Sequence, residues 1–256
     1  MLKLTYITYQ VFPNEKANTI QTIRMLESLC SFGINAQLIF PDRGFVRNDN
    51  EAIIEFYEIK ETFKISKYSH KLPFNKFNLG KLEKINFLIS SFLWSLSAVK
   101  KYFKTITKEE IIMTRTHWVL YFASKYKNKI IYECHKFSKI DNFILKRLKF
   151  NENVIVVFPN EELQKQFNLL GALSENTLIL QSAFDEKLYL SNDFEKVKNK
   201  VVFVGNLLRF NNSRNLEFLI NTFHDARLEN FNLTIIGGPN KVVNELKHSL
   251  SKNTKA

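Results

Sequence analysis

Apolar and polar positions repeat along the chain with two different periods, which indicates alternating strands and helices. Residues 2–9 are a run of β-branched and aromatic side chains, typical of a buried strand. Apolar residues then recur with a helical period over residues 19–32, and Gly33 ends that pattern. A second strand pattern at residues 36–40 stops at Pro41. We predict one strand–helix–strand unit here, with its two strands parallel.

The same alternation continues through the following part of the chain. Further strands are predicted at residues 53–59, 111–114, 130–133, 154–158 and 177–180. Helices are predicted at residues 118–125, 143–148 and 161–169. The Lys-rich stretch from residue 60 to residue 80 resembles a loop, and residues 186–199 resemble a polar connector. Strands that alternate with helices predict a doubly wound α/β domain of the Rossmann-like class.

A second α/β unit begins after the connector. Strand patterns at residues 201–205 and 232–238 enclose a helical stretch, which predicts another strand–helix–strand unit. We therefore divide the chain into residues 1–190, a complete first domain, and residues 191–256, the start of a second. Two strands and two helices bury little surface, so we expect this second domain to be incomplete within the 256 residues.

The most apolar segment covers residues 85–99 and is followed directly by Lys100 and Lys101. Its 15 residues include four serines and fall short of the roughly 20 that cross a bilayer. A buried helix is the favoured interpretation. The alternative is a helix that lies against a membrane surface, with the lysines beside it.

Charge and composition narrow the choice of partners. The net charge is +12, and residues 60–150 carry 20 Lys and Arg against 6 Asp and Glu, so the rest of the chain is close to neutral. Such a region attracts anionic lipid, nucleic acid or phosphorylated acceptors, although lysines also serve simply to solubilise exposed faces. Only seven glycines argue against a glycine-rich phosphate loop. Isolated Cys30 and Cys134, with no leader-like N-terminal pattern, favour a cytoplasmic protein.

His135 is the first candidate for chemistry because it follows the carboxyl end of a predicted strand, where doubly wound sheets place ligands. Glu133 alternates in phase with it, so the two side chains can share a face, and Lys136 flanks the pair. A lone histidine is more often structural. Arg115 and His117 follow another strand, where the alternative is an ordinary turn.

The loop at residues 10–19 holds a second group of candidates. Asn18 and Thr19 lie where the first helix begins, and each also fits a simple helix N-cap. No spacing of His, Cys, Asp or Glu indicates a metal site, and no Ser, His and Asp arrangement indicates a hydrolase.

Six segments along the chain carry a further pattern, at residues 13–22, 131–135, 154–162, 178–185, 202–223 and 233–239. In this order, they resemble segments of the GT-B glycosyltransferases, particularly the large retaining group called family four. The resemblance implies a GT-B-like fold and transfer of a sugar from a nucleotide donor to an acceptor held by the first domain. It places His135 by the transferring sugar, and Asn18, Thr19, Arg115, Glu133 and Lys136 in the acceptor cleft.

The donor site implied by the resemblance lies in the second domain. A leaving diphosphate develops negative charge, so cations or helix N-termini are needed near it. Asn206 stands where the family commonly has an arginine, which leaves Gly205, Arg209 and Arg214 as the expected phosphate-binding residues. Either arginine can reach a phosphate, or can be a solvated cation at a helix start. The resemblance implies a nucleotide-sugar co-substrate without a metal or other cofactor.

The family's Glu-x7-Glu element, which contacts the donor, would lie beyond residue 256. We therefore expect a fragment, a remnant or one part of a split enzyme, with little transferase activity of its own. The alternative is a non-catalytic accessory module that needs a partner chain. Expected acceptors are surface-polysaccharide or lipid-linked saccharides at an anionic membrane face. A GT-B-like epimerase stays open, whereas a nucleic-acid binder lacks an aromatic–basic motif.

Overall fold

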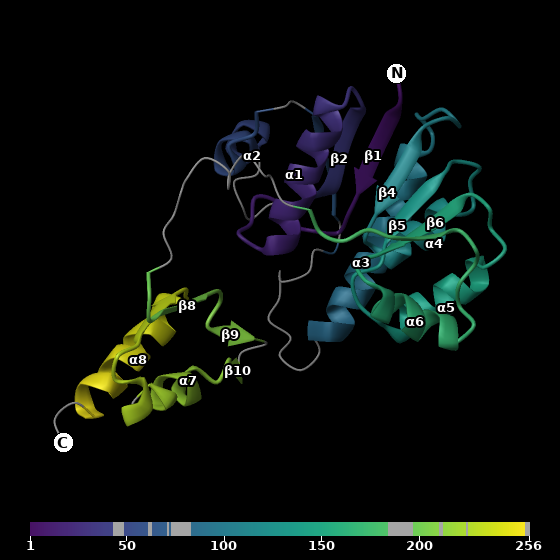
Figure 1. The fold of residues 1–256 in the computed structure, drawn as a ribbon. Helices are drawn as coiled ribbons and strands as arrows, with labels where there is room; N and C mark the ends of the chain where they lie inside the picture. Colours follow the sequence, from purple (N-terminus) through teal and green to yellow (C-terminus); the bar gives the residue numbers. More distant parts are fainter. Residues whose placement is uncertain are drawn as a thin grey trace. The chain divides into compact units, whose positions relative to one another are not determined.

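The computed structural model describes residues 1–42, 49–60, 63–70, 72, 83–183, 197–209, 212–223 and 225–253. The chain forms two compact units, Met1–Ala183 and Phe184–Ala256 (Figure 1). The boundary predicted near residue 190 and most of the predicted polar connector fall within residues 184–196, outside the described residues.

The first unit is built on a seven-stranded sheet in the order β3-β2-β1-β4-β5-β6-β7, and every neighbouring pair is parallel. The strands are β1 (Lys3–Ile7), β2 (Asn35–Asp42), β3 (Lys64–Ser69), β4 (Ile111–Thr114), β5 (Ile130–Glu133), β6 (Val154–Phe158) and β7 (Thr177–Ile179). The reversal of strand order between β1 and β4 opens a crevice at the carboxyl edge of such a sheet, which is where ligands bind.

Helices cover both faces of this sheet (Figure 1). They are α1 (Ala17–Ser31), α2 (Asn50–Tyr57), α3 (Glu83–Tyr102), α4 (His117–Ala123), α5 (Lys139–Leu148) and α6 (Glu161–Leu169). Alternate residues of β1 divide between two cores: Tyr6 packs with α1 and α2, whereas Ile7 packs with α3 and α4. The predicted doubly wound α/β fold is therefore confirmed.

Local sequence explains where several helices begin. The side chains of Asp49, Ser138 and Asn160 accept hydrogen bonds from backbone N–H groups three residues later, at the starts of α2, α5 and α6. Gly33, with φ of +78°, ends the first helix. The N-cap of α1 is Lys16, so neither Asn18 nor Thr19 is the simple cap that their residue types suggest.

The strand predicted at residues 53–59 is wrong, because helix α2 occupies this position. Ile53 and Tyr57 are buried one helical turn apart, so a pattern that alternates like a strand also fits the inward face of a short helix. The carboxylate of Asp49 accepts a hydrogen bond of 2.8 Å from the Ala52 N–H, which fixes the helical start.

The loop predicted at residues 60–80 is wrong for Lys64–Ser69, which form the edge strand β3. Lysines on an edge strand oppose pairing with another chain, and here they hide the strand pattern in a polar sequence. Residues 61, 62, 71 and 73–80 of this stretch lie outside the described residues.

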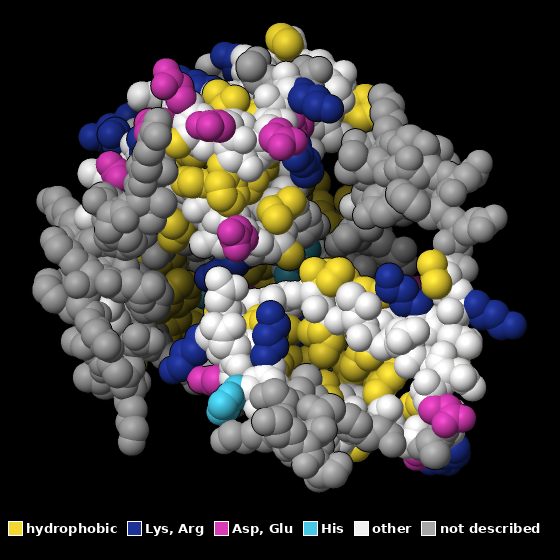
Figure 2. All heavy atoms as spheres, turned by 90° about the vertical axis from the view of Figure 1, so that its left-hand side faces the viewer, with side chains coloured by type: hydrophobic (Ala, Val, Ile, Leu, Met, Phe, Trp, Pro, Cys, Tyr) yellow, Lys and Arg dark blue, Asp and Glu magenta, His cyan; other side chains and the backbone are white. Residues whose placement is uncertain are grey.

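The apolar segment around residues 85–99 is helix α3, which buries Trp94, Ala98 and Val99 in the core that it shares with α4. Among the described residues, no helix is long and apolar enough to cross a membrane. Charged and apolar side chains intermingle on the molecular face drawn in Figure 2.

The second unit contains a parallel pair of strands, β8 (Lys200–Val204) and β11 (Asn232–Ile236). A short antiparallel pair, β9 (Leu208–Arg209) and β10 (Asn212–Ser213), follows β8. Three helical segments complete the described part: α7 (Leu216–Thr222), the 3₁₀ helix Ala226–Leu228 and α8 (Asn240–Asn253). This is the predicted strand–helix–strand unit.

Candidate functional site

Glu133 is the centre of a charged cluster at the carboxyl edge of the first sheet. The Arg115 guanidinium donates two hydrogen bonds to its carboxylate, from Nε to Oε2 at 3.0 Å and from Nη2 to Oε1 at 3.4 Å. The Tyr6 hydroxyl donates a third, at 3.0 Å. The Arg115 and Glu133 side chains are only 11% and 10% exposed, so this ion pair is largely removed from water.

His135 completes the cluster on its solvent side. Its Nε2 lies 3.7 Å from Glu133 Oε1, which is electrostatic contact rather than a hydrogen bond, and its side chain is 34% exposed. The predicted juxtaposition of Glu133 and His135 is therefore present. The imidazole is the member of the cluster that a bound molecule can reach.

The cluster keeps the Glu133 carboxylate ionised. Burial alone would raise the pKa of Glu133, but His135, Arg115 and Tyr6 together hold that pKa below its usual value. Burial, followed by the charge of Glu133, raises the pKa of the Tyr6 hydroxyl well above its usual value. Tyr6 is therefore a hydrogen-bond donor at neutral pH, and Glu133 is an acceptor next to His135.

A second histidine–carboxylate pair lies on the other face of β5. His117 Nδ1 is 3.3 Å from Asp141 Oδ1, and Asp141 also accepts hydrogen bonds from Tyr132, at 2.6 Å, and from Ser138. Burial alone would raise the pKa of Asp141, but His117, Ser138 and Tyr132 lower it. His117 Nε2 is buried without a hydrogen-bond partner in the described part of the chain. Asp141 thus fixes the orientation of His117.

Backbone loops tie these strand ends together. The Thr116 hydroxyl accepts a hydrogen bond of 3.0 Å from the Tyr9 N–H, and the Thr114 hydroxyl donates one of 2.6 Å to the Ile7 carbonyl. The loops after β1 and β4 are therefore joined beside Arg115. These bonds fix the backbone on both sides of Arg115.

The other first-unit candidates lie in different settings. Lys136 is exposed, and its carbonyl accepts a hydrogen bond of 3.6 Å from the Cys134 thiol. Asn18 is exposed on the first turn of α1. The Thr19 hydroxyl is buried and donates to the carbonyls of Asn14 and Lys16, both at 2.7 Å. Thr19 therefore stabilises its own loop, whereas Asn18 and Lys136 stay accessible.

In the second unit, Gly205 follows β8 and Gly237 follows β11, at the carboxyl ends of the two parallel strands. An Arg214 Nη1 atom lies 3.7 Å from the position that a Cβ on Gly205 would occupy, so the exposed guanidinium stands directly over this glycine. The structure thus brings Gly205 and Arg214 together. Arg209 belongs to β9, and its side chain lies outside the described part.

Sequence patterns miss two members of these clusters. Tyr6 lies inside a strand and resembles any core aromatic residue, although its inward alternation with Leu4 is visible. Asp141 lies three residues after Ser138, which is the spacing of a helix capping box and gives no hint of its bonds to Tyr132 and His117. Among the described residues, no group of three His, Cys, Asp or Glu could hold a metal ion.

The overall fold of the chain is shared with solved structures. One is a variant of Staphylococcus aureus TarM in complex with Fondaparinux, α-GlcNAc-glycerol and UDP, which is 11% identical in sequence and has a TM-score of 0.64. The match includes 97% of this chain and 75% of the TarM chain. The Escherichia coli trehalose-6-phosphate structure bound with UDP-2-fluoro glucose is 13% identical, with coverages of 98% and 68% and a TM-score of 0.56.

The chain has a GT-B-like fold. A Listeria monocytogenes protein assigned as a UDP-N-acetylglucosamine 2-epimerase shares it, with 10% identity, coverages of 95% and 65%, and a TM-score of 0.56. No family model matches the chain, and the curated proteins contain no match. At such low identities, the similarity establishes the GT-B-like fold, and function must be argued from the residues.

Proposed function

We propose that this chain takes part in glycosyl transfer from a nucleotide sugar, with His135 beside the transferring sugar and Arg214 at the donor diphosphate. The acceptor would be a surface-polysaccharide or lipid-linked saccharide. The observation that carries the proposal is the Glu133–Arg115–His135 cluster at the carboxyl edge of a GT-B-like sheet. Free Cys30 and Cys134 support a cytoplasmic location.

In this reaction the bond between the anomeric carbon and the diphosphate oxygen breaks, and a bond to an acceptor oxygen forms. The acceptor hydroxyl gives its proton to solvent water, and the nucleoside diphosphate leaves with an added negative charge. Arg214 would stabilise that charge, because a guanidinium binds phosphate oxygens through directed hydrogen bonds. His135 would accept a hydrogen bond from a sugar hydroxyl or donate one to it. Glu133 would be the positioning residue that orients the imidazole ring.

The donor half of the proposal is tested by calorimetric titration with UDP. We expect Arg214→Gln to weaken UDP binding about 10-fold, the loss of one charge-assisted hydrogen bond. Arg227→Gln is the matched control, because Arg227 is an exposed arginine of the same unit that pairs with Asp225. Binding that is absent at millimolar UDP, or lost equally in both variants, would contradict the proposed donor site.

Turnover is tested with UDP-sugars and saccharide acceptors, with all products identified. In a preparation that turns over, we expect His135→Asn to lower turnover about 100-fold while the melting temperature stays within a few degrees. An equal loss of stability would make His135 a structural residue. UDP binding without any product would favour the accessory module, and an epimerised nucleotide sugar would favour an epimerase.

A further inference from the structure

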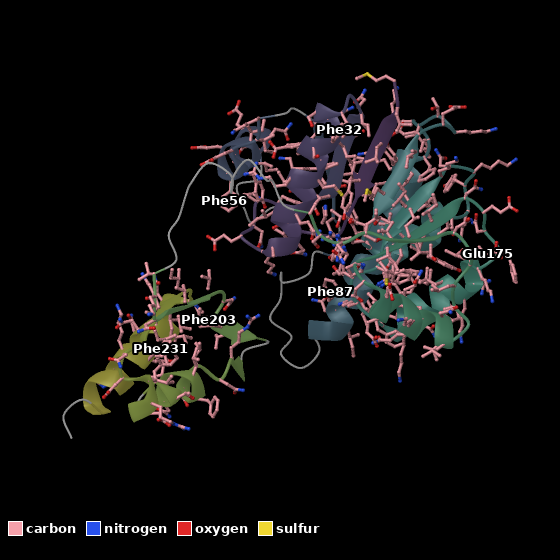
Figure 3. All side chains as sticks on the ribbon, viewed as in Figure 1. Phe32, Phe56, Phe87, Glu175, Phe203 and Phe231 are labelled. Carbon is pink, nitrogen blue, oxygen red and sulfur yellow. The ribbon has the colours of Figure 1, made fainter. Side chains whose placement is uncertain are left out.

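Helix α3 exposes a row of aliphatic side chains along one face. Ile85, Ile89 and Leu93 are spaced four residues apart, so they lie on the same side of the helix, and they are 54%, 49% and 45% exposed. Phe87, which is labelled in Figure 3, lies near the same end of the helix and is 39% exposed. The centroid of its ring lies 5.6 Å from that of the Tyr9 ring. The first half of the exposed α3 face is therefore apolar.

Helix α3 becomes basic toward its end, where Lys100 lies on the same face as Leu93 and Lys101 lies about 100° further round the helix. Lys100 and Lys101 lie in the last turn of α3, and Lys104 follows it; all three are exposed. Residues 85–108 contain four lysines and neither Asp nor Glu. Lys101 Nζ is 4.5 Å from the centroid of the Tyr68 ring, which holds this cation at the helix end.

A cavity opens between these lysines and an aromatic pair. Its volume is about 460 Å³, and its lining residues are Ser97, Lys100, Lys101, Phe103, Lys104 and Tyr126. The Phe103 and Tyr126 rings stack at 4.0 Å and form its wall. A cavity lined by three lysines is suited to a phosphate group carried on an organic molecule.

We infer that α3 is the docking face of the first unit for a membrane rich in anionic phospholipid. Ile85, Ile89 and Leu93 would enter the boundary between headgroups and acyl chains, and the lysines would surround lipid phosphates. An amphipathic helix with aliphatic and basic sections lies in the membrane plane and does not cross it. A polynucleotide would satisfy the lysines but would leave the aliphatic row in water, because its bases stack on aromatic side chains.

This inference does not rest on the proposed function, and it is tested by binding to vesicles of phosphatidylcholine with and without phosphatidylglycerol. We expect binding only when phosphatidylglycerol is present, weakening with salt. Replacement of Lys100, Lys101 and Lys104 by Gln should weaken it on the order of 100-fold, about five-fold for each lysine near an anionic surface.

A matched control removes the same charge elsewhere on the first unit. Lys139, Lys146 and Lys165 are exposed lysines of α5 and α6, and their replacement by Gln should change vesicle binding by less than about three-fold. Equal losses in the two triple variants would overturn the inference, because total charge alone would then explain the binding.

The aliphatic row has its own test. Replacement of Ile85, Ile89 and Leu93 by Gln should weaken vesicle binding at least about 10-fold and leave the melting temperature unchanged, since these side chains are exposed. Unchanged binding of this variant, no binding at low salt, or tighter binding of a single-stranded oligonucleotide than of vesicles would each overturn the inference.

Discussion

Glu133 is ionised at a position where burial by itself would favour the neutral acid. Its carboxylate accepts hydrogen bonds from Arg115 and Tyr6 and lies next to His135. Each partner therefore stabilises a charge that has little access to water. Removing one partner leaves the Glu133 carboxylate buried with less to stabilise its charge. The loss of unfolding free energy is then far larger than an ion pair contributes when it is exposed to water.

Arg115→Met tests this dependence. We expect the variant to lose about 3 kcal/mol of unfolding free energy in urea denaturation, because it leaves Glu133 buried without its main counter-charge. Lys165→Met is the matched control, since Lys165 forms an exposed pair with Glu161, 65% and 69% exposed, and should lose less than about 0.5 kcal/mol. Similar losses in the two variants would mean that the Glu133 cluster is not held by its ion pair.

Part of this cluster can be predicted from the sequence, and the limit is physical. Alternation along one strand places Glu133 and His135 on the same side, so their proximity follows from local geometry. The pairing of Glu133 with Arg115 depends on the register between β4 and β5. A sequence with many lysines and arginines does not show which of them faces a given carboxylate.

At the scale of elements, strands buried on both faces are the most predictable. The boundaries predicted for β4, β5 and β6 match the structure, because short apolar runs bounded by polar residues have few other interpretations. The segments predicted wrongly lie near the sheet edge. A half-buried helix such as α2 and a lysine-bearing strand such as β3 each satisfy more than one period, and tertiary packing decides between them.

The junction between β8 and β11 gives an element-scale prediction. A Cβ on Gly237 would lie 1.9 Å from the Gly205 carbonyl oxygen, so Gly237→Ala must push the two strand ends apart. We expect a loss of 1–3 kcal/mol, typical of overpacking, together with weaker UDP binding as Gly205 and Arg214 shift.

The hydrogen-exchange rates of the β8 and β11 amides measure the effect of Gly237→Ala, which we expect to raise them. Gly238→Ala is the control, because its added Cβ would meet nothing closer than 3.8 Å. Faster exchange in both variants, or in neither, would show that close approach at Gly237 does not hold this strand pair together.

At the scale of the whole molecule, two largely buried acidic groups make the stability of the first unit depend on pH. Glu133 and Asp141 both have folded-state pKa values below their unfolded values, which are about 4.3 and 3.9. The stability they contribute is therefore complete above the unfolded values. It is lost as pH falls through the lowered folded values.

Glu133→Gln should flatten this acid dependence. We expect the unfolding free energy of the variant to fall less steeply below about pH 4, by up to about 1.4 kcal/mol per pH unit, although the variant is less stable at pH 7. Urea denaturation at a series of pH values measures the slope. Exposed Glu161→Gln is the control, and a Glu133→Gln curve parallel to the wild-type curve would contradict the linkage.

The two cysteines of the first unit differ in how fast they can be alkylated, and this difference reports opening of the sheet. Burial, followed by the nearby Asp141 charge, raises the pKa of the Cys134 thiol to about 12, whereas Cys30 is partly exposed on α1. Only the thiolate reacts with an alkylating reagent. At neutral pH, Cys134 is therefore unreactive for two reasons: it is buried, and its thiol is protonated. In a timed pulse of reagent, a mass increase of one adduct marks an intact sheet and two adducts mark an opened one. The rate at which the second adduct forms then measures how often strand β5, which carries Glu133, separates from the sheet.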